Sequence, residues 1–118
     1  MPKVLMVDDN LDLLEVLGIY IRGAGIEALA ATSFEEVQAL GPALDEVTLA
    51  ILDVNLGYGR PGGLEICAWL KEHHSACRIV FLTGHASTHP LVQAAAANGE
   101  VLAKPMDARR LIQLALAS

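Results

Sequence analysis

Short apolar runs alternate along this chain with longer segments in which apolar residues recur every three or four positions. Three of the short runs are apolar throughout, as strands must be when helices cover both faces of a parallel sheet. Glu27 interrupts a further run, which indicates a strand at the edge of the sheet. The predicted strands are Lys3–Val7, Ile26–Ala31, Thr48–Leu52, Arg78–Leu82 and Val101–Ala103.

The longer segments have the start and stop signals of helices. In the first, Leu14, Leu17 and Ile21 form one apolar stripe, and glycine follows at positions 23 and 25. Ser33 and Glu36 have the spacing of a capping box at the start of the second. The predicted helices are Leu11–Arg22, a segment from Ser33 to Gly41-Pro42, Leu64–His74, Pro90 to Asn98-Gly99, and a last helix that is capped by Asp107 and runs through Ala117.

The order of elements is therefore a strand followed by a helix, repeated five times. Right-handed crossovers turn such a chain into an open parallel sheet with helices on both faces, an α/β fold. The 118 residues contain no linker, internal repeat or low-complexity segment. We expect a single domain over residues 1–118, with no output domain after Ser118.

Charge and composition limit the classes of partner. The net charge is −6, and the 8 basic residues are scattered among 14 acidic ones, so we expect no direct binding to nucleic acid or to an anionic membrane. Asp8 and Asp9 end the first apolar run too early for a signal peptide, and no run approaches the roughly 20 apolar residues of a membrane span. Cys67 and Cys77 are too far apart for a CxxC motif and suit a reducing compartment. These features predict a cytoplasmic protein.

Residues with chemically useful side chains come at the end of four predicted strands. Asp8 and Asp9 follow the first strand, Asp53 the third, Thr83 the fourth and Lys104 the fifth. In open α/β sheets, ligands bind at the carboxyl ends of the strands, where the strand order reverses. The sequence therefore predicts three carboxylates, a hydroxyl and an ammonium group at one edge of the sheet.

Carboxylates crowded in this way repel one another unless a cation lies between them. Mg²⁺ prefers oxygen ligands and is commonly held by one or two carboxylates together with a phosphate. A phosphoryl group needs cations and hydrogen-bond donors in place beforehand, which Lys104 and Thr83 can supply. Asp53, at the centre of the predicted sheet, is the candidate nucleophile. An aspartyl phosphate is a mixed anhydride that water can hydrolyse, which suits a timed switch.

At this point the chain resembles the receiver domain of two-component response regulators, over its whole length from Lys3 to the last helix. The resemblance implies a flavodoxin-like, doubly wound (βα)5 fold with a five-stranded parallel sheet of order 2-1-3-4-5. The matching stretches are VLMVDDN at Val4–Asn10, LAILDVNL at Leu49–Leu56, GGLEI at Gly62–Ile66, IVFLTGHA at Ile79–Ala86 and VLAKP at Val101–Pro105.

The resemblance implies a metal site and a phosphoacceptor. Asp53 would take a phosphoryl group from a histidine kinase or a phosphotransfer protein and pass the signal to a downstream target protein. Asp9, Asp53 and the backbone carbonyl of Asn55 would ligate Mg²⁺ directly, and Asp8 would act through a metal-bound water.

Two further roles concern the phosphoryl group itself. Lys104 would bind it, and the peptide bond from Lys104 to Pro105 is expected to be cis. Thr83 would move to a phosphoryl oxygen and report phosphorylation to the surface formed by the fourth helix, fifth strand and fifth helix.

The chain departs from the family pattern at a few positions. Val101 stands where receivers usually have an aromatic switch residue, so the usual coupling between threonine and aromatic ring cannot operate. The glycine-rich loop 54–62 is longer than typical, and its Tyr58 or Arg60 either leans over the site or faces solvent. His85, two residues after Thr83, is predicted to tune the lifetime of the phosphate. His73 and His74 form no metal set and would shield a helix end or face water.

Alternative functions remain open on the sequence alone. A phosphohydrolase usually has a second acid two residues after the nucleophile, where this chain has Asn55. A flavin or nucleotide module is disfavoured by the acidic turn after the first strand. A receiver-like adaptor that is not phosphorylated is the remaining alternative, since Val101 breaks the usual route of the signal. Ala94–Ala97 suits packing against a second copy, in a homodimer, or against the sheet.

Overall fold

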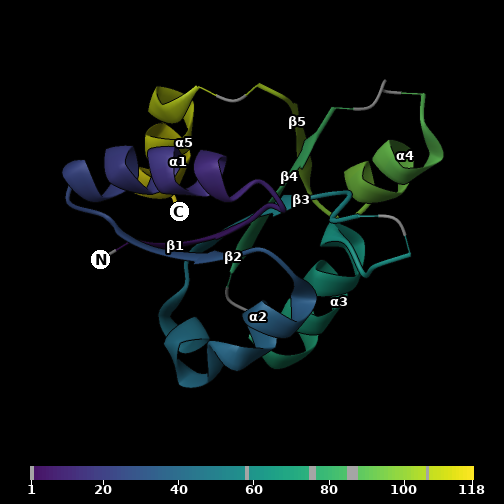
Figure 1. Cartoon of the computed structure of the whole chain (residues 1–118), viewed down its shortest axis with the longest axis horizontal. Helices are drawn as coiled ribbons and strands as arrows, with labels where there is room; N and C mark the ends of the chain where they lie inside the picture. The colour runs from purple at the N-terminus through teal and green to yellow at the C-terminus, as the bar shows by residue number, and fades with distance from the viewer. Residues whose placement is uncertain (1, 58, 75–76, 85–87, 106) are drawn as a thin grey trace.

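The computed structural model describes residues 2–57, 59–74, 77–84, 88–105 and 107–118. Its centre is a five-stranded parallel sheet of order β2-β1-β3-β4-β5, with α-helices on both faces (Figure 1). The strands are β1 (Lys3–Val7), β2 (Glu27–Ala31), β3 (Leu49–Asp53), β4 (Arg78–Thr83) and β5 (Glu100–Ala103). This confirms the predicted doubly wound fold: β1 has the bounds expected, and each end of the other strands lies within one residue of the expected position.

Helices α1 and α5 cover one face of the sheet, and α2 and α3 cover the other (Figure 1). Helix α4 contributes Ala95 to the core layer that α3 also fills. The helices are α1 (Leu11–Gly23), α2 (Phe34–Ala39), α3 (Gly63–His73), α4 (Pro90–Ala96) and α5 (Ala108–Leu116), with a short 3₁₀ helix at Gly41–Glu46. Ala95 is buried, whereas Ala94, Ala96 and Ala97 are exposed, so the alanine-rich segment packs on the sheet with one side only.

Two core layers explain why the central strands are apolar throughout. Successive side chains of a strand point to opposite faces of the sheet. In β1, Val4 and Met6 pack in the layer beneath α1 and α5, while Leu5 and Val7 pack in the layer beneath α2 and α3. All of β1 and β3 is buried, and only a helix on each face makes that possible.

The second helix begins as predicted but ends earlier. Ser33 Oγ accepts a hydrogen bond from the Glu36 N–H at 3.2 Å, which caps the first turn. The Glu36 carboxylate turns back to the Thr32 N–H and hydroxyl, at 2.6 and 2.7 Å. The helix ends at Ala39, and the chain continues as the 3₁₀ turn Gly41–Glu46 rather than stopping at Gly41-Pro42. Gly41 has φ +54°, a left-handed conformation that ends the α-helical ladder.

Among the described residues, no helix is both long and apolar enough to cross a membrane.

Candidate functional site

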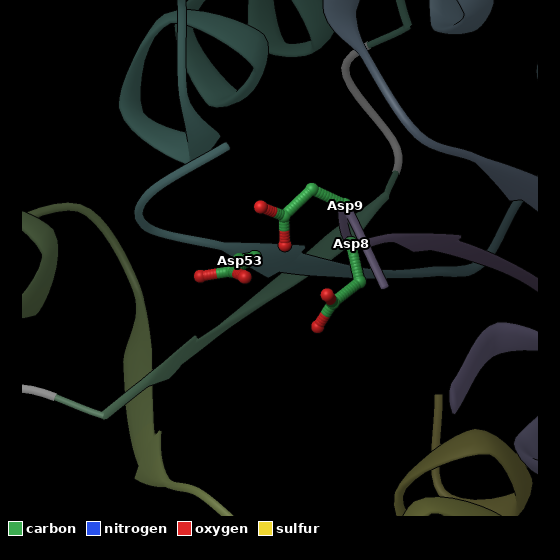
Figure 2. Close-up of side chains that lie close together, drawn as sticks. All are labelled: Asp8, Asp9 and Asp53. Carbon is green, nitrogen blue, oxygen red and sulfur yellow. The ribbon is translucent and has the colours of Figure 1, made fainter. Parts of the chain in front are cut away.

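Three carboxylates gather at the carboxyl edge of the sheet (Figure 2). Asp8 and Asp9 follow β1, and Asp53 is the last residue of β3. The parallel register pairs Val7 of β1 with Leu52 of β3, so the residues after each come out side by side. Each of the three aspartates offers one carboxylate oxygen, and these oxygens lie within 4.8 Å of one another. Asp8 and Asp53 are buried, and Asp9 is exposed.

Lys104 reaches this cluster from the fifth strand. Its Nζ donates a hydrogen bond to Asp53 Oδ2 at 2.7 Å and lies 3.0 Å from Asp8 Oδ2. The backbone places it there because the Lys104 N–H bonds to the Thr83 carbonyl at 2.9 Å, which extends the pairing of β4 with β5. The peptide bond between Lys104 and Pro105 is cis, as expected.

Backbone N–H groups fix the remaining oxygens of the two buried aspartates. The Asn10 N–H donates to Asp8 Oδ1 at 2.9 Å, and the Asn55 N–H donates to Asp53 Oδ1 at 3.0 Å. Both are bonds to an N–H two residues further along, the geometry of an Asx turn. The Asn55 side chain makes a third such turn, because its Oδ1 accepts from the Gly57 N–H at 2.9 Å. The carboxylates are therefore oriented before any ligand arrives.

The pocket raises the pKa of both Asp53 and Lys104, which disfavours the charged form of the aspartate and favours that of the lysine. Burial raises the pKa of Asp53, and this outweighs the hydrogen bonds from Lys104 and from the Asn55 N–H. Burial by itself would lower the pKa of Lys104, but the hydrogen bond to Asp53 and the two carboxylates raise it above its ordinary value. The lysine is thus firmly charged, while ionising Asp53 is costly without another cation.

The donor set fits a hard metal ion. Asp8 Oδ2 is buried, and its contact among the described residues is the ion pair with Lys104 Nζ at 3.0 Å, which leaves it able to accept a further partner. A buried oxygen of this kind is normally satisfied by protein, water or an ion. Together with Asp9 and Asp53 it forms an acidic triad that is able to hold a metal ion.

Thr83 completes the edge between Asp53 and Lys104. It is the last residue of β4, it is buried, and it pairs with Ala103, the residue before Lys104. Asp53 pairs with Leu82, directly before Thr83. The five side chains that the sequence predicts for the site therefore come from four adjacent strand ends.

The same chain, over residues 4–116, matches the family model of the response regulator receiver domain. The protein belongs to the receiver family. It is 31% identical to the photosynthetic apparatus regulatory protein RegA of Cereibacter sphaeroides, over 98% of this chain and 61% of RegA. It is 28% identical to the response regulator protein PilR of Pseudomonas aeruginosa, over 95% of this chain and 25% of PilR. The chain thus spans a quarter to three fifths of these relatives.

The structure is also similar to solved receivers. It superposes on the receiver domain of NtrX from Brucella abortus with a TM-score of 0.77 and 26% sequence identity, over 97% of this chain and 95% of that one. A receiver in two-component signalling is a phosphoacceptor rather than an enzyme with a substrate of its own. The acidic pocket of Asp8, Asp9 and Asp53 is where this receiver has the chemistry that phosphate acceptance needs.

The remaining predicted residues lie away from the pocket or outside the described residues. Tyr58 and His85 are not among the described residues, so the roles predicted for them stay predictions. Arg60 lines a hollow of about 360 Å³ between the loop after β3 and the start of α2. His73 Nδ1 lies 2.9 Å from the Trp69 carbonyl and His74 Nδ1 lies 3.1 Å from Asp45, so both hold the end of α3.

Two glycines near the site were not singled out as site residues from the sequence. A methyl group on Gly62 would overlap the carbonyl oxygen of Val54, and one on Gly63 would lie 2.5 Å from that of Asp53. The feature of the sequence that could have pointed to them is the Gly-Gly pair in the matching stretch Gly62–Ile66. The sequence does not show, however, that this pair packs against the backbone that follows Asp53.

Proposed function

We propose that this receiver accepts a phosphoryl group on Asp53 from a histidine kinase or a phosphotransfer protein, in a Mg²⁺-dependent reaction. It then acts as a phosphorylation switch or relay toward a downstream target protein. The observation that supports this most is the contact of Lys104 Nζ with Asp53 Oδ2, 2.7 Å, inside a cluster of three carboxylates. A nucleophile, a phosphate-binding cation and a metal-binding set are thereby within one pocket.

The metal would be held by the side chains of Asp9 and Asp53 and by the backbone carbonyl of Asn55, with Asp8 acting through a water. When bound, Mg²⁺ supplies positive charge that offsets the carboxylates and the phosphoryl oxygens. The chain's own residues prepare that arrangement, because the Asn10 and Asn55 N–H groups already orient one oxygen of each buried aspartate. Such preorganisation avoids reorganisation during the reaction.

In the transfer, a carboxylate oxygen of Asp53 forms a bond to phosphorus while the bond from phosphorus to the donor's imidazole nitrogen breaks. The other nitrogen of the donor's ring carries a proton, so the electron pair of the broken bond returns to the imidazole and the ring leaves as neutral imidazole. Lys104 holds Asp53 Oδ2 in the resting state, so its ammonium group is in place to meet a phosphoryl oxygen once the carboxylate has reacted. Asp53 Oδ1 keeps the Asn55 N–H as its donor at 3.0 Å.

Readout would begin at Thr83, whose hydroxyl comes from the strand between Asp53 and Lys104. Two residues earlier on β4, Phe81 pairs with Val101 of β5, and Val101 packs against the core layer that contains Phe81. Because valine has no ring to rotate, movement of Thr83 would be passed on by displacement of β5 and α4 rather than by a change of an aromatic rotamer.

The donor would approach along α1. Val16, Ile19 and Tyr20 of this helix are exposed, and a groove of about 480 Å³ runs between α1 and α5. A second hollow of about 310 Å³, lined by Lys104 among others, shares Leu13 with that groove. The two hollows thus meet at Leu13, and the second reaches Lys104 at the proposed phosphorylation site, so a donor docked along α1 would have its imidazole near Asp53.

The test is to incubate the purified protein with a small-molecule phosphodonor, with and without Mg²⁺, and to record its intact mass beside Asp53→Asn. We expect a single phosphoryl adduct that needs both Mg²⁺ and Asp53. If the folded protein binds Mg²⁺ and takes no phosphoryl group, the proposal is wrong. That result would favour the adaptor that signals without phosphorylation, and Val101 would then be the residue to examine.

A further inference from the structure

The first turn of α3 lies directly on the backbone that follows the candidate phosphoacceptor. Gly63 is so close that an added Cβ would lie 2.5 Å from the Asp53 carbonyl oxygen and 3.2 Å from Leu52 Cβ. At Gly62 the added atom would overlap the Val54 carbonyl oxygen. Side-chain carbons essentially never come this near to backbone oxygens, so any larger residue at either position must displace one of the two segments.

The backbone of Val54, the residue between Asp53 and Asn55, is hydrogen-bonded on two sides. On one side, the Val54 N–H donates to the Leu82 carbonyl of β4 at 3.0 Å. On the other, the Val54 carbonyl accepts a longer bond from the Gly63 N–H at 3.4 Å. The next residue, Asn55, directs its N–H to Asp53 Oδ1, so the same short segment sets both the aspartate side chain and the orientation of the Asn55 peptide.

Glu65 ties this contact to the helix. Its Oε2 accepts a hydrogen bond from the Gly62 N–H at 2.7 Å, which closes the first turn of α3 at the point of closest approach. Glu65 itself is exposed, so this bond adds little to the core. The charged acceptor makes it a strong bond for its size, and it holds Gly62 against Val54.

We propose that Gly62 and Gly63 are positioning residues for the metal site: their lack of side chains lets α3 fix the Asp53–Asn55 backbone in the geometry that binds the cation. The inference rests on the proposed function, in which the cation is Mg²⁺ and the Asn55 carbonyl is one of its ligands. A bulkier residue at position 63 would push the two segments apart and misplace both Asp53 and that carbonyl. Groups that orient metal ligands typically affect affinity by about 10- to 100-fold.

The experiment is a Mg²⁺ titration by calorimetry of the wild type, Gly63→Ala and two matched controls. Gly23→Ala makes the same change at the end of α1, where an added Cβ meets no atom within 4 Å. Ile66→Val removes one methyl group from the core side of α3 without touching the glycine contact. We expect Gly63→Ala to bind Mg²⁺ about tenfold or more weakly and both controls to bind like the wild type.

A second readout needs no metal. The Asn55 amide resonance in the Mg²⁺-free protein should shift in Gly63→Ala and stay unchanged in Ile66→Val, because only the former moves the N–H that bonds to Asp53. Wild-type Mg²⁺ affinity in Gly63→Ala would overturn the inference. An equal loss of affinity in Ile66→Val would also overturn it, because general loosening of α3 would then be the cause.

Exposed Glu65 gives a test that does not depend on tolerance at position 63. Glu65→Ala removes the acceptor for the Gly62 N–H, whereas Glu65→Gln keeps an acceptor and removes the charge. We expect weaker Mg²⁺ binding in Glu65→Ala than in Glu65→Gln, and equal affinities would contradict the inference. A wild type that binds Mg²⁺ yet takes no phosphoryl group would overturn the proposed function alone, since these affinities need no phosphorylation. A wild type that binds no Mg²⁺ would overturn both.

Discussion

The two edges of the sheet have charged residues in opposite circumstances. At the amino edge, Arg78 and Glu100 form an ion pair of 2.9 Å whose side chains are about two fifths and one third exposed, so solvent shares their charge. At the carboxyl edge, Asp8 and Asp53 are buried and both pair with the ammonium group of Lys104, and the carboxylate of exposed Asp9 lies beside them. At the amino edge, opposite charges are paired and exposed to solvent. At the carboxyl edge, buried negative charges outnumber the positive charge. That imbalance costs stability and is the property that a cation and a phosphoryl group can use.

The largest expected effect is on the phosphorylation rate, and it comes from comparing methionine substitutions of two lysines that lie at opposite edges of the sheet. Lys104→Met removes the cation beside Asp53, and we expect phosphorylation by a small-molecule donor to slow by about 10²- to 10³-fold, because the phosphoryl charge loses its fixed partner. Lys3→Met removes a buried lysine of the amino edge, whose ion-pair partner among the described residues is exposed Glu27 at 3.8 Å. Its phosphorylation rate should equal that of the wild type. Equal rates in both variants would show that Lys104 has no role in the transfer.

Metal affinity should follow the same division. Asp8→Asn keeps the shape of the side chain but removes a buried charge from the triad, so we expect Mg²⁺ binding to weaken by about 10- to 100-fold. Glu100→Gln removes an acid at the amino edge and serves as the matched control. Titration of both variants by calorimetry measures the effect. A similar loss in the control would mean that net charge, rather than this pocket, attracts the cation.

The buried excess charge should also appear as pH-dependent stability. Because the pKa of Asp53 is raised in the folded protein, the folded state binds more protons than the unfolded state between the two pKa values, and stability falls as pH rises through that window. Asp53→Asn removes this penalty. Without Mg²⁺ we expect its Tm to exceed that of the wild type at pH 7, with the gain disappearing below about pH 4, where the carboxyl is protonated in both states.

Thermal melts of the wild type and Asp53→Asn from pH 3.5 to 8 would test this, with Asp12→Asn as the control on an exposed residue of α1. A gain in Tm that is constant across the range would contradict the account. Saturating Mg²⁺ should reverse the order at pH 7, because only the wild type keeps the full set of ligands and is stabilised by binding.

The smallest effect belongs to the amino edge. Arg78→Ala breaks the pair with Glu100, but both side chains are partly solvated and Glu100 also lies 3.6 Å from Arg110. We expect the free energy of unfolding to change by less than about 1 kcal/mol, measured by denaturant titration. A larger loss would mean that the ion pair at this edge contributes strongly to stability and that the two edges differ less than described.

Most of the fold could be predicted because it depends on local patterns. The apolar run of β3 is buried on both faces, as its composition requires, and Asp107 caps the last helix by accepting from the Arg109 N–H at 2.9 Å. The early end of α2 was missed, because the choice between a helix end at Gly41 and a 3₁₀ turn through Leu44 depends on packing of Leu44 in the core.

The site was predictable where it follows from strand ends and not where it depends on contacts between segments. Parallel pairing alone brings the ends of β1 and β3 together, so the clustering of Asp8, Asp9 and Asp53 could be foreseen. The approach of Gly63 to the Asp53 carbonyl could not, since it depends on how α3 docks on the sheet. The Asx turns of Asp8 and Asp53, in which the Asn10 and Asn55 N–H groups are the donors, are likewise visible only in three dimensions.

The central claim is that Asp53 receives the phosphoryl group, and its most direct measurement is chemical mapping of the phosphorylated position. Protein treated with a phosphodonor and Mg²⁺ is reduced with borohydride, which converts an aspartyl phosphate into homoserine, and the peptides are sequenced by mass spectrometry. The account predicts homoserine at position 53 alone, and none when Mg²⁺ is omitted. Homoserine at position 8 or 9, or an unmodified residue 53 in protein that has gained a phosphoryl group, would contradict it.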